Sequence, residues 1–148
     1  MSVDASRLDH LVTVLHPGKL SAADAETIVA ISQLAVDADG SEDTAEIRMF
    51  FTLGKAVFKL AGLTDSPTPT FAVDEDDDER LRSLAGQLSD TDARELAYAV
   101  AHVLTIIDID ISPAEDRFLT QLRDALGLAP ARAEELAQLA GAAITPGQ

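Results

Sequence analysis

The sequence predicts an all-α protein of about seven helices. Apolar residues recur every three or four positions over most of the 148-residue chain, which is the spacing of one face of a helix. Helix-capping residues or prolines precede several of these segments. Aromatic residues make up only 4% of the chain and alternating β-branched runs are absent, so strands are not indicated. The length favours a single domain over residues 1–148.

The first three helices are each marked at their start. We expect the first to begin after Asp4 and to end before Pro17, because proline cannot continue a helix. Ser21 is the expected cap of the second helix. The third begins at Asp43 and keeps a regular helical spacing of apolar residues as far as Ala61.

A polar linker, residues 64–79, precedes the remaining helices. It contains two prolines and ends in an acidic run, which places negative charge at the start of the fourth helix, where the helix dipole favours it. Asp90 is expected to cap the fifth helix, and Pro113 to begin the sixth, which ends at Gly127. Pro130 begins the seventh. The predicted core comprises Phe50, Phe51, Val57, Leu96, Val103, Leu119 and Leu122.

The chain contains an internal repeat at an offset of 69 residues, the separation of Asp39 from Asp108. Residues 21–63 form the first copy and residues 90–128 the second. Each copy reads as a helix, a short acidic loop and a second helix. Because neither hairpin can bury its apolar face alone, we expect the two to pack about a pseudo-two-fold axis. Matching pairs include Ser21 with Asp90, Glu26 with Glu95, and Glu46 with Glu115.

Composition excludes several classes of function. The chain has 11 basic and 26 acidic residues, a net charge of −15, so we expect no nucleic-acid partner. Without cysteine it can form no disulfide, thiolate zinc site or cysteine nucleophile. No basic leader with an apolar core and no apolar run near ~20 residues is present, so we expect a cytoplasmic protein without membrane insertion.

Carboxylates gather at two predicted helix C-termini. Asp37 and Asp39 follow the second helix, and Asp108 and Asp110 follow the fifth. Unpaired carbonyls make a helix C-terminus partly negative, so a carboxylate there is unfavourable by up to about 1 kcal/mol. A bound cation would offset this cost, and oxygen ligands suit Ca²⁺, Mg²⁺ or Mn²⁺.

The same segments also match capping boxes. In such a box, the glutamate three residues after the cap reaches back to the cap's own N–H group. Residues 43–46 end in Glu46 and residues 112–115 end in Glu115, as this motif requires. Under this alternative the neighbouring aspartates simply occupy turns that they favour. The residues alone leave metal binding and capping open.

A pair of EF-hands is not indicated. If Glu46 holds the twelfth loop position, Gly40 falls on the sixth, as the motif requires. However, Ala35 then occupies the first position, where an acidic ligand is needed, and the second segment has Leu104 there. We therefore reject this interpretation.

The two segments resemble the repeated signature of the tellurite-resistance protein B (TerB-like) family. In that signature an apolar helix leads into Asp-Gly, a capping residue and a glutamate. The match runs over residues 34–46 and again over residues 106–115, and residues 118–128 resemble the family's usual close. The resemblance covers most of residues 21–140. The chain departs from the family pattern in two ways: Ile109 stands where glycine is usual, and an insert separates the halves. It therefore resembles a divergent member of the family.

The resemblance implies a bundle of about seven helices in which acidic residues of both repeats form a cation site. Carried over residue by residue, the implied ligands are Asp39, Glu46, Asp108 and Glu115. The neighbouring acidic residues Asp37, Asp43 and Asp110 are weaker candidates that the resemblance does not itself imply.

The leading functional expectation is a non-enzymatic, divalent-cation-binding adaptor that acts on another protein. Its connection with tellurite, metal or oxidant stress comes from the resemblance alone. No organic cofactor is expected. The alternatives are an ion-free acidic protein-interaction module and a hydrolase that uses a metal-activated water.

Overall fold

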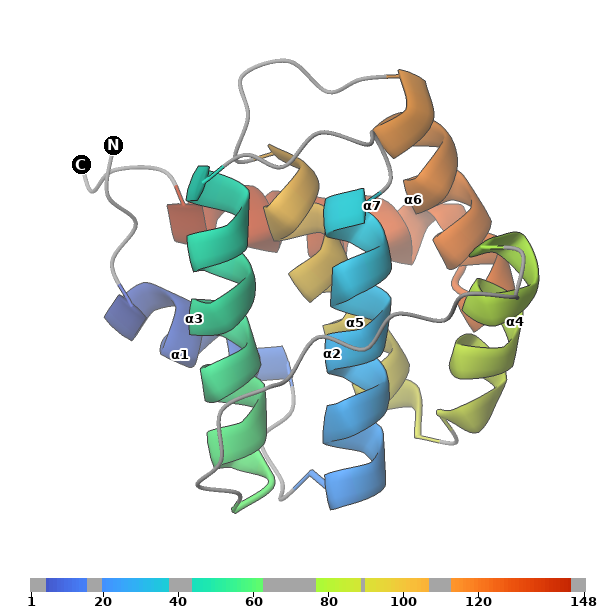
Figure 1. Cartoon of the computed structure of the whole chain (residues 1–148). Coiled ribbons are helices and arrows are strands. Elements are labelled where there is room, and N and C mark those ends of the chain that lie inside the picture. Colours follow the sequence, from blue (N-terminus) through green and yellow to red (C-terminus); the bar gives the residue numbers. More distant parts are fainter. Residues whose placement is uncertain are drawn as a thin grey trace.

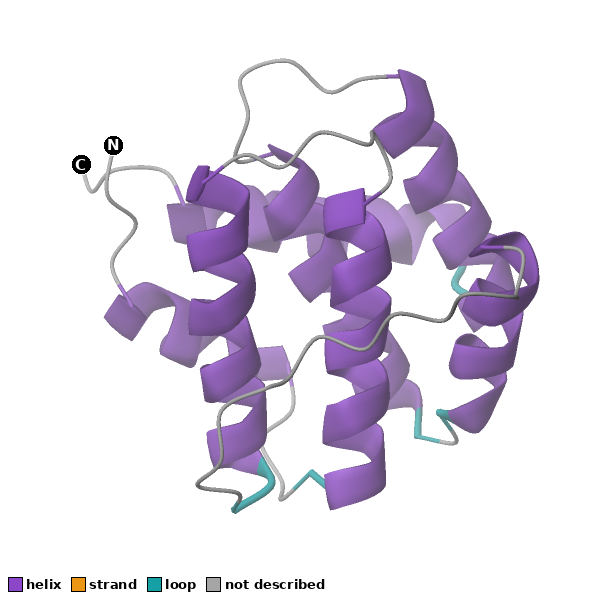
Figure 2. Cartoon of the chain, viewed as in Figure 1, coloured by secondary structure: helices purple, strands orange, loops and turns teal. Residues whose placement is uncertain are grey.

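The computed structural model describes residues 5–15, 20–37, 44–62, 77–88, 90–106 and 113–144. Every regular element in these ranges is an α-helix, which confirms the predicted all-α class (Figures 1 and 2). None of these helices is both long and apolar enough to cross a bilayer. The helices are α1 (Ala5–Leu15), α2 (Ala22–Asp37), α3 (Thr44–Leu60), α4 (Asp77–Gln87), α5 (Thr91–Ile106), α6 (Pro113–Leu126) and α7 (Pro130–Ile144).

Hydrogen bonds confirm the predicted starts of α2 and α5. The Ser21 hydroxyl oxygen accepts a bond from the N–H of Asp24 at 3.1 Å. At α5 the carbonyl of Asp90 accepts a bond from the N–H of Arg94 at 3.1 Å, and its carboxylate lies 3.4 Å from the N–H nitrogen of Asp92. The two side-chain contacts satisfy N–H groups that have no partner within the helix, and the Asp90 carbonyl accepts the first hydrogen bond of α5 itself.

Gly127 ends α6, as the sequence predicts. Its φ of 71° is a left-handed conformation that glycine adopts without strain. The N–H of Leu128 then reaches back to the carbonyl of Arg123 at 3.1 Å, which closes the last turn of the helix. Pro130 is the first residue of α7, also as predicted. The other expected caps, Asp4, Asp43 and Ser112, lie outside the described residues.

α5 is the central helix of the described structure. It packs against α1, α2, α3, α6 and α7, and so has neighbours on most sides (Figure 1). Four of its alanines are completely buried, and such small side chains allow neighbouring helices to approach closely. The buried residues of α5 are Ala93, Leu96, Ala97, Tyr98, Ala99, Val100, Ala101, Val103 and Leu104.

The other helices pack in the pattern that two related hairpins would give. α2 packs against α3, α5 packs against α6, and α2 and α5 pack against each other. In addition, α1 lies against α3 as α4 lies against α6. These contacts do not establish that residues 21–63 superpose on residues 90–128, so the internal repeat remains a prediction.

The predicted core is confirmed at all but one position. The exception is Phe51, which is only partly buried. Its ring packs edge-on against that of Phe50, with centroids 5.3 Å apart and an interplanar angle of 72°. Phe51 therefore lies at the edge of the core, beside a ring that is itself buried. The confirmed residues are Phe50, Val57, Leu96, Val103, Leu119 and Leu122.

Truncation of a leucine on α5 tests the central position of this helix. Leu96 is completely buried, so Leu96→Ala should lower the free energy of unfolding by about 2–5 kcal/mol through lost contacts and a residual cavity. The matched control is Leu139→Ala on α7, where the side chain is 39% exposed and the loss should stay below about 1 kcal/mol. Urea unfolding followed by circular dichroism measures both. Equal losses would contradict the assignment of α5 as the central helix.

Candidate functional site

The predicted metal ligands fall largely outside the described residues. Asp37 ends α2, and Glu46 and Glu115 lie in the first turns of α3 and α6, but their side chains are not described. Among the side chains that are described, no three histidine, aspartate or glutamate residues could hold a metal ion. None of the predicted ligands is among those described side chains. The residues outside the described ranges are Asp39, Asp43, Asp108 and Asp110.

The four described helix ends that flank the acidic segments lie at one end of the molecule. α2 and α5 pack against each other and both run toward this end, where α3 and α6 begin (Figure 1). Neither α2 nor α5 has a basic residue in its last turn, whereas α3 has Lys59 and α6 has Arg123 there. The partial negative charge at the two C-termini is therefore not offset by a basic side chain of the same helix turn.

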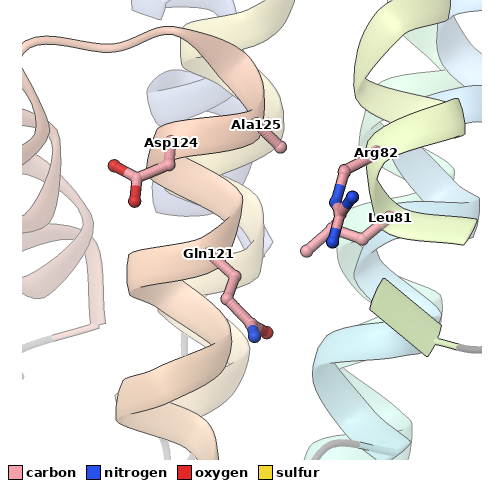
Figure 3. Close-up of a pocket in the computed structure, with 5 residues that line it drawn as sticks. All are labelled: Leu81, Arg82, Gln121, Asp124 and Ala125. Carbon is pink, nitrogen blue, oxygen red and sulfur yellow. The ribbon is translucent and has the colours of Figure 1, made fainter. Parts of the chain in front are cut away.

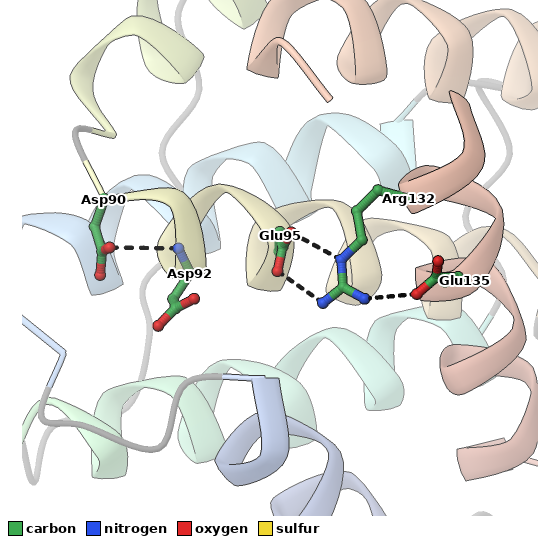
Figure 4. Close-up of polar contacts among 5 residues, drawn as sticks. All are labelled: Asp90, Asp92, Glu95, Arg132 and Glu135. Carbon is green, nitrogen blue, oxygen red and sulfur yellow. Dashed lines mark hydrogen bonds and ion pairs between the residues drawn. The ribbon is translucent and has the colours of Figure 1, made fainter. Parts of the chain in front are cut away.

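Three charged residues form a cluster that joins α5 to α7 (Figure 4). Arg132 donates two hydrogen bonds to the carboxylate of Glu95, at 2.8 and 2.9 Å, and a third to Glu135 at 2.9 Å. The Glu95 side chain is only 12% exposed, while that of Arg132 is 38% exposed. The hydrogen bonds that Arg132 donates to Glu95 are the main reason that the pKa of Arg132 is raised, so its guanidinium remains charged.

The sequence did not reveal this charged cluster. At the repeat offset Glu95 corresponds to Glu26, yet Glu26 is exposed and Glu95 is held by α7. The sequence could have indicated only the pair within α7, because Arg132 and Glu135 lie three residues apart on one helix. The contact with Glu95 spans 37 residues, and no local pattern reports a contact at that separation.

Two aromatic rings stack one turn apart on α5. The ring centroids of Tyr98 and His102 lie 6.1 Å apart, at an interplanar angle of 21°. Burial lowers the pKa of His102, because a charged imidazole is poorly solvated there. Burial also raises the pKa of Tyr98; the nearby Arg123 opposes this shift and Asp116 adds to it. Both rings are therefore held in their neutral forms at neutral pH.

A small cavity lies between α4 and α6 (Figure 3). Its volume is about 310 Å³, at the lower end of the range for small-molecule sites. No motif in the sequence pointed to it, because its lining comes from two helices, of which only α6 belongs to a predicted repeat. The lining residues are Leu81, Arg82, Gln121, Asp124 and Ala125.

No family model, curated protein or solved structure matches this chain. The likeness to the TerB-like family therefore remains a resemblance carried by short acidic motifs.

Removal of the Glu95 charge tests the cluster that joins α5 to α7. Glu95→Gln keeps the size of the side chain but replaces one acceptor oxygen with an NH₂ group that faces the guanidinium. We expect the free energy of unfolding to fall by about 1 kcal/mol. The control, Glu135→Gln, removes the same charge from a side chain that is 63% exposed, and should cost under about 0.5 kcal/mol. Chemical denaturation distinguishes them; equal losses would contradict a special role for Glu95.

The lowered pKa of His102 predicts a pH-dependent stability. As the pH falls below 6.5, the unfolded chain takes up the proton before the folded chain does, so His102 destabilises the fold in acid. His102→Gln should therefore flatten the loss of stability between pH 7.5 and pH 5. His10→Gln, at an exposed position, is the control. An unchanged slope in His102→Gln, measured by urea unfolding at each pH, would refute this assignment.

Proposed function

We propose that the chain is a non-enzymatic, divalent-cation-binding adaptor. The cation would be held at the end of the molecule where α2 and α5 terminate, by acidic residues of both predicted repeats. The proposed ligands are Asp39, Glu46, Asp108 and Glu115. The observation that supports this proposal is the location of the four flanking helix ends, which share one end of the described structure (Figure 1).

Electrostatics gives the physical reason for a cation here. Two helix C-termini with partial negative charge point the same way, without a basic residue in the last turn of either helix. Each is followed in the sequence by further carboxylates, in a chain whose net charge is −15. A divalent cation would reduce the repulsion among these groups, and hard oxygen ligands favour Ca²⁺, Mg²⁺ or Mn²⁺ over softer metals.

The adaptor role follows from what such a cation would connect. Each predicted repeat would contribute two ligands, so the bound ion would link the α2–α3 hairpin to the α5–α6 hairpin. A protein partner could then distinguish the ion-bound surface from the ion-free surface, whose negative charge is larger. The proposed setting, a response to metal or oxidant stress, rests on the resemblance to the TerB-like family.

Thermal unfolding with and without divalent cations tests this proposal. A cation at 100 times its Kd stabilises the native state by about 2.7 kcal/mol. For a chain of this size, that stabilisation corresponds to a rise in Tm of about 5–10 °C relative to a sample in EDTA. Calorimetry with Ca²⁺, Mg²⁺ and Mn²⁺ in turn would identify the preferred ion.

A pair of double variants makes this test specific to the predicted ligands. Asp39→Asn with Asp108→Asn should abolish the shift in Tm. The control, Glu26→Gln with Glu134→Gln, removes the same charge from two exposed positions and should keep the shift. Absence of any shift at millimolar ion would favour the ion-free interaction module instead, and an equal loss in both double variants would mean that only net charge matters.

A further inference from the structure

The cavity between α4 and α6 combines an arginine with an apolar wall. The side chain of Arg82 extends from α4 into the space between the two helices (Figure 3). Leu81, which is 2% exposed, and Ala125 face the same space from opposite sides. Gln121 on α6 adds an amide, which can both donate and accept hydrogen bonds.

The acidic residue of the cavity does not neutralise Arg82. The carboxylate of Asp124 points away from Arg82 in Figure 3, and it accepts hydrogen bonds from the guanidinium of Arg123 at 3.2 and 3.3 Å. Within the described part of the chain, Arg82 has no carboxylate within ion-pair distance. The cavity therefore presents a positive charge, although the protein as a whole is strongly negative.

We infer that this cavity binds a small organic monocarboxylate with a compact apolar body. The planar guanidinium of Arg82 matches a carboxylate in a two-bond geometry that lysine could not provide. The Gln121 amide donates a further hydrogen bond to the same anion, and the apolar body of the ligand lies against Leu81 and Ala125. The volume of about 310 Å³ limits the ligand to one small ring or a short chain.

Charge determines which ligands this cavity rejects. A dianion or a phosphate would meet the field of a protein with a net charge of −15, and Arg82 is the one basic residue among the residues that line the cavity. A cation would be repelled by Arg82 itself. A ligand with a single carboxylate and an apolar body can pair its charge with the guanidinium of Arg82 and place its apolar part against Leu81 and Ala125.

Benzoate is a suitable probe, because it has a planar carboxylate on one apolar ring. Titration into the ¹⁵N-labelled full chain should shift the backbone amide signals of Arg82, Gln121 and Ala125. Benzamidine, which has the same ring with a positive charge, should not shift them. All samples contain EDTA, so the outcome is independent of the proposed cation site.

Three variants test which residues hold the carboxylate. Arg82→Gln should weaken benzoate binding by at least about ten-fold. Arg117→Gln removes the same charge from an exposed position on α6 and should leave the affinity unchanged. Ala125→Leu keeps the charge but fills the cavity, and should also abolish binding. The inference is overturned if benzoate does not bind at millimolar concentration, if Arg82→Gln binds it as well as the parent chain, or if benzamidine binds equally well.

Discussion

The burial of α5 is the constraint on which the rest of this fold depends. A helix with neighbours on most sides cannot place charged groups along its length, because an unpaired buried charge is very costly. Accordingly, its charged residues Asp92, Arg94 and Glu95 all lie in its first two turns. Residues 96–104 include no aspartate, glutamate, lysine or arginine, and their one titratable base, His102, has a pKa that burial lowers. Arg94 directs its Nε–H to the carbonyl of Leu88 at 2.7 Å, near the start of the helix. Five other helices then supply the apolar surface that covers α5.

The last helix makes the two halves of the molecule unequal. α7 packs along α5 and also contacts α1. Its Arg132 forms an ion pair with Glu95 of α5, whose side chain is mostly buried. A carboxylate can be tolerated there because two charge-assisted hydrogen bonds replace those that it loses to water. The glutamate at the corresponding position of the first half, Glu26, remains exposed. If the two halves derive from one hairpin, α7 therefore explains why the glutamate of the second half is buried and ion-paired while that of the first half is exposed.

Two opposite electrostatic environments follow from the same packing. Because α2 and α5 run in the same direction, their C-termini meet at one end and concentrate negative potential there. Between α4 and α6, the pairing of Asp124 with Arg123 leaves the guanidinium of Arg82 as the charge that faces the cavity. The proposed cation would lie at that end of the molecule, and the proposed monocarboxylate in this cavity. Neither environment depends on the other.

Local sequence patterns were enough to predict the all-α class, the caps Ser21 and Asp90, the end of α6 at Gly127 and six of the seven core residues. These features depend on local backbone hydrogen bonds and on helical periodicity, both of which lie within one segment of the chain. The exception, Phe51, is only partly buried, because the helices that pack against α3 decide how far each neighbouring position is covered. The acidic ligands remain a prediction, because their side chains lie outside the described structure.

Helix packing, in contrast, places α5 at the centre, pairs Arg132 with Glu95 and puts Arg82 beside a cavity. Each of these depends on which helices become neighbours. That choice results from the fit of whole helix surfaces, which bring together residues tens of positions apart, and no spacing within a single segment encodes it.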